Sequence, residues 1–162
     1  MKNLLWRACR NAIPTKENLV RRTVLEDLVC DRCNGALDNP LHALWSCFEL
    51  DVVWIDTSLW SLKRTHMFMD FKELLSWVIQ QVKNLELFAM IAWSIWTQRN
   101  QVRLAQLNVN LHLLAQVSKD WHEEFMALQV PRSLPQQVDP CFVAISPLGM
   151  LQNKFRRSYF CC

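Results

Sequence analysis

The stretch CDRCNGALDNPLHALWSC, residues 30–47, decides how the rest of the chain is interpreted. It holds a C-x2-C-x8-H-x4-C series formed by Cys30, Cys33, His42 and Cys47. Two residues between cysteines allow one tight turn to aim both sulfurs at a single ion, and thiolate and imidazole ligands suit tetrahedral zinc. The spacing therefore predicts a Zn²⁺ site with four protein ligands.

The residues between the ligands predict the local backbone. Gly35, just behind the first cysteine pair, permits left-handed geometry at the end of the turn. The run DNPLHALWSC indicates a short helix that Asp38 or Asn39 can cap. His42 then projects from this helix, and Cys47, five residues on, is expected at or past the helix end.

An alternative interpretation is that these residues are ordinary buried thiols and a core histidine, because free cysteine is among the most buried residue types. A lone C-x2-C pair leaves the two interpretations evenly balanced. A histidine and a third cysteine at ligand spacing favour the metal. Four protein ligands also close the coordination shell, which predicts a structural site and no enzymatic activity.

Composition favours an all-α fold. The 162 residues can hold one domain, or a small domain with a helical extension. Hydrophobic residues make up 51% of the chain and include eight tryptophans, while glycine occurs only twice, so tight β-turns should be few. We expect a small helical zinc-binding domain, then a helical hairpin or bundle, then an irregular tail.

The seven cysteines could form a secreted disulfide framework, but two observations oppose this. The chain does not open on a signal peptide, and four cysteine and histidine positions follow metal spacing. An intracellular protein, nuclear or cytoplasmic and not secreted, is therefore expected. The longest apolar run, around residues 87–96, is far shorter than the roughly 20 residues a bilayer needs, so we expect no membrane span.

Positive charge gathers at the start of the chain. Residues 1–22 contain six Lys and Arg side chains against one Glu, a local net charge of +5, whereas the whole chain carries +3. Such a segment can follow a phosphate backbone, although a solvated helix face is at least as common. The candidate nucleic-acid contacts are Arg7, Arg10, Lys16, Arg21 and Arg22.

The chain divides into four predicted regions. Residues 1–62 form the zinc-binding domain, in which one helix ends at Pro14, Thr15 caps a second, and Trp45 and Trp54 cover the metal site. These tryptophans could instead stack on bases, but their aliphatic neighbours favour core packing. Residues 63–69 are a predicted linker and 70–129 a helical connector. Residues 130–162, with four of the six prolines, are predicted to be disordered.

Three predicted helices make up the connector. Asp70 can cap the first, residues 70–82. The second, residues 85–103, is apolar nearly all round and therefore buried, but its end, WTQRNQVRLAQ, is polar and is expected to emerge into solvent with Arg99 and Arg103 as a basic i,i+4 pair. The third covers residues 111–128, and the helices should pack as a small antiparallel bundle.

Three motifs together resemble the zinc-binding domain that follows the reverse transcriptase in plant non-LTR, LINE-type retrotransposons. LLWRACRNAIPTKENLVRR is similar to that family's FLWR…LPT…NL-x-RR entry, and CDRCNGALDNPLHALWSC with Val53 and Trp54 to its CPxC…E…HLLxxC…VW core. MIAWSIWTQRNQVRL resembles its W-x-x-W-x-x-RN helix. The chain departs from the pattern at Asp31, where the family has proline, and at Asp38, which stands four positions before the histidine.

The resemblance implies a module from a mobile element that copies RNA into DNA, with the family's metal positions at the four residues already named. No Asp-Asp pair for a polymerase and no RNase H motif occurs in the sequence, so we expect a fragment truncated before the RNase H-like domain. Two further interpretations stay open. One is a structural module that docks on a reverse transcriptase or another protein without binding RNA or DNA; the other is a relic fragment without selected activity.

Overall fold

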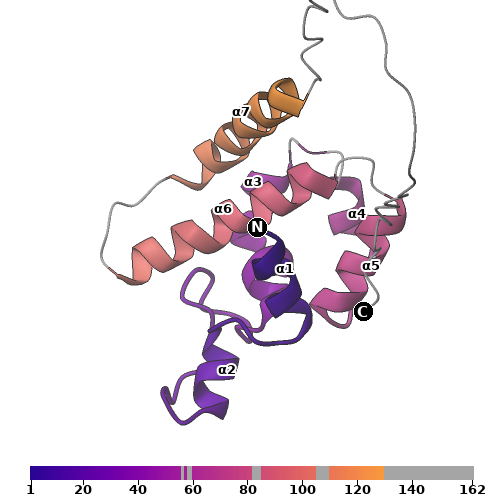
Figure 1. Cartoon of the computed structure of the whole chain (residues 1–162). Helices are drawn as coiled ribbons and strands as arrows, with labels where there is room; N and C mark the ends of the chain where they lie inside the picture. The colour runs from indigo at the N-terminus through magenta and orange to yellow at the C-terminus, as the bar shows by residue number, and fades with distance from the viewer. Residues whose placement is uncertain (56, 58–59, 82–84, 105–109, 130–162) are drawn as a thin grey trace, which may run out of the picture. The chain divides into compact units, whose positions relative to one another are not determined.

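The computed structural model describes residues 1–55, 57, 60–81, 85–104 and 110–129 (Figure 1). The chain divides into two units, Met1–Pro131 and Arg132–Cys162, and all described residues belong to the first. These residues form helices and no strand, which confirms the all-α prediction. The predicted disordered tail, 130–162, lies outside the described residues.

Seven α-helices and two short irregular turns, η1 and η2, follow one another along the described residues. They are α1 (Lys2–Cys9), α2 (Lys16–Arg21), η1 (His42–Ser46), η2 (Phe48–Leu50), α3 (Asp51–Trp54), α4 (Trp60–Thr65), α5 (Phe71–Gln81), α6 (Leu85–Arg103) and α7 (Leu111–Gln129). The first helix ends five residues before Pro14, and α4 enters the segment predicted as a linker. The boundaries between the four predicted regions stay predictions.

Two helices begin where the sequence predicts a cap. The Thr15 Oγ1 atom accepts a hydrogen bond from the Asn18 backbone N–H at 3.5 Å, so α2 starts one residue later. Asp70 Oδ1 accepts from the Glu73 N–H at 2.8 Å, and Glu73 Oε2 accepts from the Met69 N–H at 2.6 Å. These reciprocal bonds form a capping arrangement that fixes the start of α5.

An aromatic cluster in the core connects η1 and α3 with α6. The Trp45 and Trp54 ring centroids lie 4.9 Å apart, and Trp54 stacks on Phe88 of α6 at 5.5 Å. Both tryptophans are buried, with at most 2% of their surface exposed. They therefore pack in the core, as predicted, and neither offers a face to a nucleic-acid base.

Helices α6 and α7 pack against each other through small and aliphatic side chains. Leu114 and Ala115 of α7 are buried, and the Ser118 and Ser94 Oγ atoms are hydrogen-bonded at 2.9 Å in a buried position. Further along α7 the apolar side chains are less covered, since Trp121 is 45% exposed and Phe125 38%. None of the described helices combines the length and hydropathy that a bilayer crossing requires.

Candidate metal centre

The structure brings the four predicted ligand residues together. One side-chain donor atom from each of Cys30, Cys33, His42 and Cys47 lies within 4.8 Å of all the others. Cys33 Sγ lies 3.3 Å from His42 Nε2. Zn–S bonds of about 2.3 Å in a tetrahedron place sulfur atoms about 3.8 Å apart. Small side-chain adjustments therefore suffice for these four donors to hold one ion.

The first cysteine pair lies on a hairpin-like turn. The Cys30 carbonyl accepts from the Asn34 N–H at 2.9 Å, the Cys30 N–H donates to Ala36 O at 2.9 Å, and an antiparallel bridge follows between Val29 and Leu37. The left-handed residue of this turn is Asn34, with φ of 51°, and not Gly35 as the sequence suggested. Asparagine tolerates this conformation because its short polar side chain adapts to it.

The second ligand pair is positioned by η1, a single π-helical turn. The Cys47 N–H donates to the His42 carbonyl at 3.2 Å, an i→i+5 bond. This wider turn brings residues five apart into line, which an ordinary α-turn does not. Cys47 lies just past the helix end, as predicted. Asn39 is the cap, because its Oδ1 accepts from the His42 N–H at 2.8 Å.

Two of the thiols interact strongly with each other. A hydrogen bond with Cys47 is the largest influence that lowers the pKa of Cys30, and the same bond raises the pKa of Cys47. Burial raises the pKa of both thiols. One of the two sulfurs is thus favoured as a thiolate, and the other keeps its proton. A bound divalent cation favours deprotonation of both, so metal binding should release protons.

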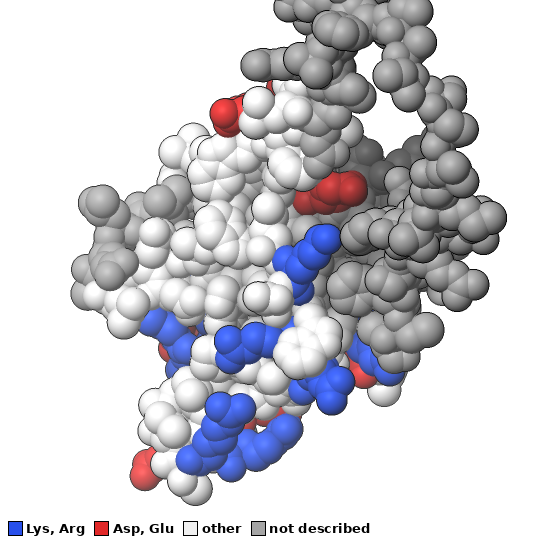
Figure 2. Space-filling model, in the orientation of Figure 1, with Lys and Arg blue, Asp and Glu red and all other residues white. Residues whose placement is uncertain are grey.

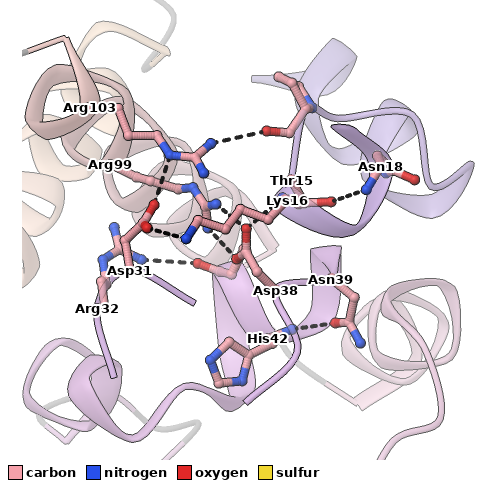
Figure 3. Close-up of polar contacts among 12 residues, drawn as sticks. Thr15, Lys16, Asn18, Asp31, Arg32, Asp38, Asn39, His42, Arg99 and Arg103 are labelled. Atoms are coloured by element: carbon pink, nitrogen blue, oxygen red, sulfur yellow. Dashed lines mark hydrogen bonds and ion pairs between the residues drawn. The ribbon is translucent and has the colours of Figure 1, made fainter. Parts of the chain in front are cut away.

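Asp38 occupies the centre of the loop between the two ligand pairs and is completely buried. Arg99 of α6 forms a two-pronged ion pair with it: Arg99 Nη1 donates to Oδ1 at 2.6 Å, and Nη2 donates to Oδ2 (Figure 3). The Lys16 backbone N–H also donates to Asp38 Oδ2, at 2.7 Å. One carboxylate thereby joins the metal loop, the start of α2 and the end of α6.

This ion pair corrects one prediction. Arg99 was expected in solvent as half of a basic pair with Arg103, but only 5% of Arg99 is exposed. Arg103 Nε donates instead to Asp31 Oδ2 at 3.0 Å. The polar end of α6 is buried because Asp38 supplies the opposite charge for Arg99. The sequence did contain an indication of this burial, since Arg99 continues the apolar register of Phe88, Ala92 and Ile95.

Arg32, inside the first cysteine pair, is a second connection to α6. Its guanidinium donates to Ala43 O at 3.1 Å, to Ile95 O at 3.0 Å and to Gln98 Oε1 at 2.9 Å. Burial, with a further contribution from nearby Arg99, lowers the pKa of Arg32, although an arginine remains charged. Sequence reasoning missed this role, because two of the three acceptors are backbone carbonyls, which leave no residue signature, and the third, Gln98, is distant in the sequence.

The five candidate nucleic-acid contacts fall into two groups. Arg7, Arg10, Arg21 and Arg22 are exposed on or just after α1 and α2. Lys16 is buried, and its Nζ lies 2.6 Å from Asp27 Oδ2 and 2.5 Å from Asp31 Oδ1. Figure 2 shows blue side chains gathered around α1 and α2. The arginines can reach a partner, whereas the Lys16 charge is already paired within the fold.

The fold and site thus define a small helical domain with a Cys₃His cluster that can hold a metal ion. Residues 1–54 match the family model described as zinc-binding in reverse transcriptase, which agrees with the domain that the sequence motifs resemble. The match includes all four cluster residues. No curated protein and no solved structure is significantly similar to the chain.

Proposed function

We propose that the chain is a non-catalytic module that a structural zinc ion stabilises and that contacts the phosphate backbone of RNA or DNA. The convergence of four donors within 4.8 Å carries the zinc part of this proposal, and the family match supports it. Cys30, Cys33, His42 and Cys47 would hold the ion and fix the loop geometry. Four protein ligands leave no position for the bound water that hydrolytic zinc sites use.

The nucleic-acid part of the proposal rests on the exposed arginines of the first two helices. Arg7 and Arg10 lie one turn apart on and just after α1, where Arg10 lies over the Trp6 ring at 5.2 Å. Arg21 is the last residue of α2 and Arg22 follows it, and Arg21 Nη2 lies 3.3 Å from Glu17 Oε1. Guanidinium groups make strong, two-pronged bonds to phosphate oxygens. A sequence-tolerant contact to single- or double-stranded nucleic acid follows.

The test is the salt dependence of binding to a fluorescein-labelled 25-nucleotide RNA and to a DNA duplex of about the same length. We expect affinity to fall linearly with salt on logarithmic axes. Arg21→Gln/Arg22→Gln should reduce the slope by about 0.7 to 0.9 for each phosphate that the variant no longer neutralises. The matched control is Arg64→Gln/Lys72→Gln, which removes two exposed charges from α4 and α5.

Equal losses of affinity in both double variants would indicate a non-specific charge effect and contradict the assignment to α2. Absence of salt-dependent binding in zinc-loaded protein would reject nucleic acid as the partner and leave the protein-docking alternative. The zinc claim is measured separately, by metal content, and does not depend on either result. A compartment that keeps the three cysteines reduced is part of the proposal, because only thiolates ligate zinc.

A further inference from the structure

The second half of α7 presents an apolar face to solvent. Trp121, Phe125 and Leu128 recur at i, i+4 and i+7, which places them on one side of the helix. Their exposed fractions are 45%, 38% and 73%. Single exposed apolar residues are common, but three in register form a continuous face of the kind that marks a binding surface.

Helix α6 supplies the opposite wall of a groove along this face. Met90 and Trp93 of α6 lie across from α7, and the Trp93 and Trp121 ring centroids are 5.9 Å apart. The groove has a volume of about 430 Å³, which is in the range of ligand pockets. The buried Ser94–Ser118 hydrogen bond holds the two helices together one turn away. The groove is therefore a formed feature of the helix pair.

The rim of this groove is acidic, although the chain as a whole is basic. Glu124 lines the groove, and Asp120 is exposed one turn earlier on the same side of α7, whereas Lys119 and Glu123 lie on the other side of the helix. Figure 2 shows mainly uncharged side chains over α6 and α7, whereas the blue ones lie around α1 and α2. Charge complementarity therefore favours an occupant with apolar side chains flanked by Lys or Arg.

We propose that this groove binds an amphipathic helix with a basic flank, contributed by another protein. In helix-in-groove recognition, the bound helix inserts apolar anchors at i, i+3, i+4 and i+7 into the groove. A second copy of this chain is a poor occupant, because its basic helix α1 already buries Leu5 and Ala8 in its own core. The groove is formed by α6 and α7 with Met1 at its edge, and the inference is independent of the proposed nucleic-acid contact.

The probe is a designed 18-residue peptide with Leu at the four anchor spacings and Lys elsewhere, labelled with fluorescein. Its control has the same composition in scrambled order. We expect saturable binding of the patterned peptide to the zinc-loaded full chain, measured by fluorescence anisotropy.

Phe125→Ala/Leu128→Ala should weaken binding of the patterned peptide about tenfold or more, because a few large apolar anchors carry most of the binding energy of an interface. The matched control, Met67→Ala/Met69→Ala, changes two apolar residues that are 96% and 90% exposed before α5 and should leave binding unchanged.

Charge reversal provides a second variant at an exposed position that the fold does not need. Glu124→Lys should weaken the Lys peptide about tenfold and strengthen a version with Glu in place of Lys, because the rim then carries the opposite charge. Equal binding of the scrambled peptide, or no effect of either variant, would overturn the proposal. So would sedimentation that shows a dimer of the chain which Phe125→Ala/Leu128→Ala dissociates, since the occupant is then a second copy.

Discussion

The Cys₃His cluster and the buried Asp38–Arg99 ion pair fix the same loop in different ways. The cluster draws its four members from 18 consecutive residues, 30–47, whereas the ion pair joins residues 61 positions apart. Asp38 lies between the two ligand pairs in the sequence. The cluster shapes the loop itself, and the ion pair attaches that loop to α6.

The Cys₃His cluster and the Asp38–Arg99 ion pair also differ in how they contribute to stability. A metal ion replaces protons on thiols and gains coordination bonds that have no counterpart in the unfolded chain. A buried ion pair must first lose the hydration of both charges, and its attraction offsets that cost only with good geometry and additional hydrogen bonds. Asp38 meets this condition, because Arg99 contacts both of its oxygens and the Lys16 N–H contacts one. The metal should therefore dominate stability, and the ion pair should dominate the placement of α6.

The largest effect is expected from loss of one metal ligand. Cys33→Ser should abolish stoichiometric zinc in the purified protein and lower its helicity to that of the chelated wild type. Structural zinc contributes on the order of 10 kcal/mol to folding in small zinc domains. The measurements are metal content by mass spectrometry and far-UV circular dichroism with and without chelator. Cys9→Ser, which alters a half-buried thiol of α1 outside the cluster, is the control.

Two results would contradict this expectation. If the wild type purified with zinc in the buffer contains none, the cluster is a group of buried thiols and a core histidine. If Cys33→Ser and Cys9→Ser lose the same amount of helicity, the effect comes from core packing and not from coordination. Either result would also weaken the proposed function, which depends on the metal.

Local patterns were sufficient to predict the cluster. Ligand spacing identified all four residues, because a turn of two residues and a helix of one turn leave few other arrangements of the side chains. Helix caps at Thr15 and Asp70 were readable for the same reason: a cap is a contact over three residues. The π-helical form of η1 could not be predicted in this way, since an i→i+5 turn depends on the position that the loop must reach in the folded chain.

Long-range partners could not be predicted from spacing. Asp38 was one of two candidate helix caps, and Arg99 was expected to be a solvent-exposed charge, because each is normal in its own segment. Only the fold brings them together, and burial then reverses the expected environment of both residues. The register of Arg99 with Phe88 and Ile95 did indicate that its side chain points into the core, and only the polarity of arginine opposed this interpretation. A charged residue on an apolar stripe thus predicts a buried partner elsewhere in the chain.

A smaller but still large effect is expected from breaking the ion pair. Asp38→Ala leaves Arg99 buried without its counter-charge and should cost about 3–5 kcal/mol of unfolding free energy. The double variant Asp38→Leu/Arg99→Leu should recover part of this loss, because neither charge then remains buried alone. Urea unfolding of zinc-saturated protein, followed by tryptophan fluorescence, measures both values.

Arg103→Met is the matched control for this comparison. It removes the next arginine on the same face of α6, whose partner Asp31 is 48% exposed. Half-exposed pairs contribute about 0–1 kcal/mol, so this variant should be close to the wild type. If Arg103→Met costs as much as Asp38→Ala, burial is not what distinguishes the two pairs, and the attachment of the loop to α6 is more widely distributed.

The smallest effect is expected at Lys16, which forms ion pairs with Asp27 and Asp31. Hydrogen bonds to Asp27 and Asp31 raise the pKa of Lys16 above its ordinary value. Its stabilising contribution is therefore complete below the unfolded-state pKa and is lost as the pH rises through the higher folded-state pKa. The carboxylates behave in the opposite way: the bond from Lys16 lowers the pKa of Asp27, so that contribution is lost as the pH falls.

Because acid also protonates the metal ligands, the alkaline side gives the cleaner measurement. We expect the stability difference between wild type and Lys16→Met to stay constant from about pH 7 to 10 and to shrink above that range. A difference that persists unchanged at high pH would mean that Lys16 stabilises the loop by the packing of its methylene chain and not by its charge.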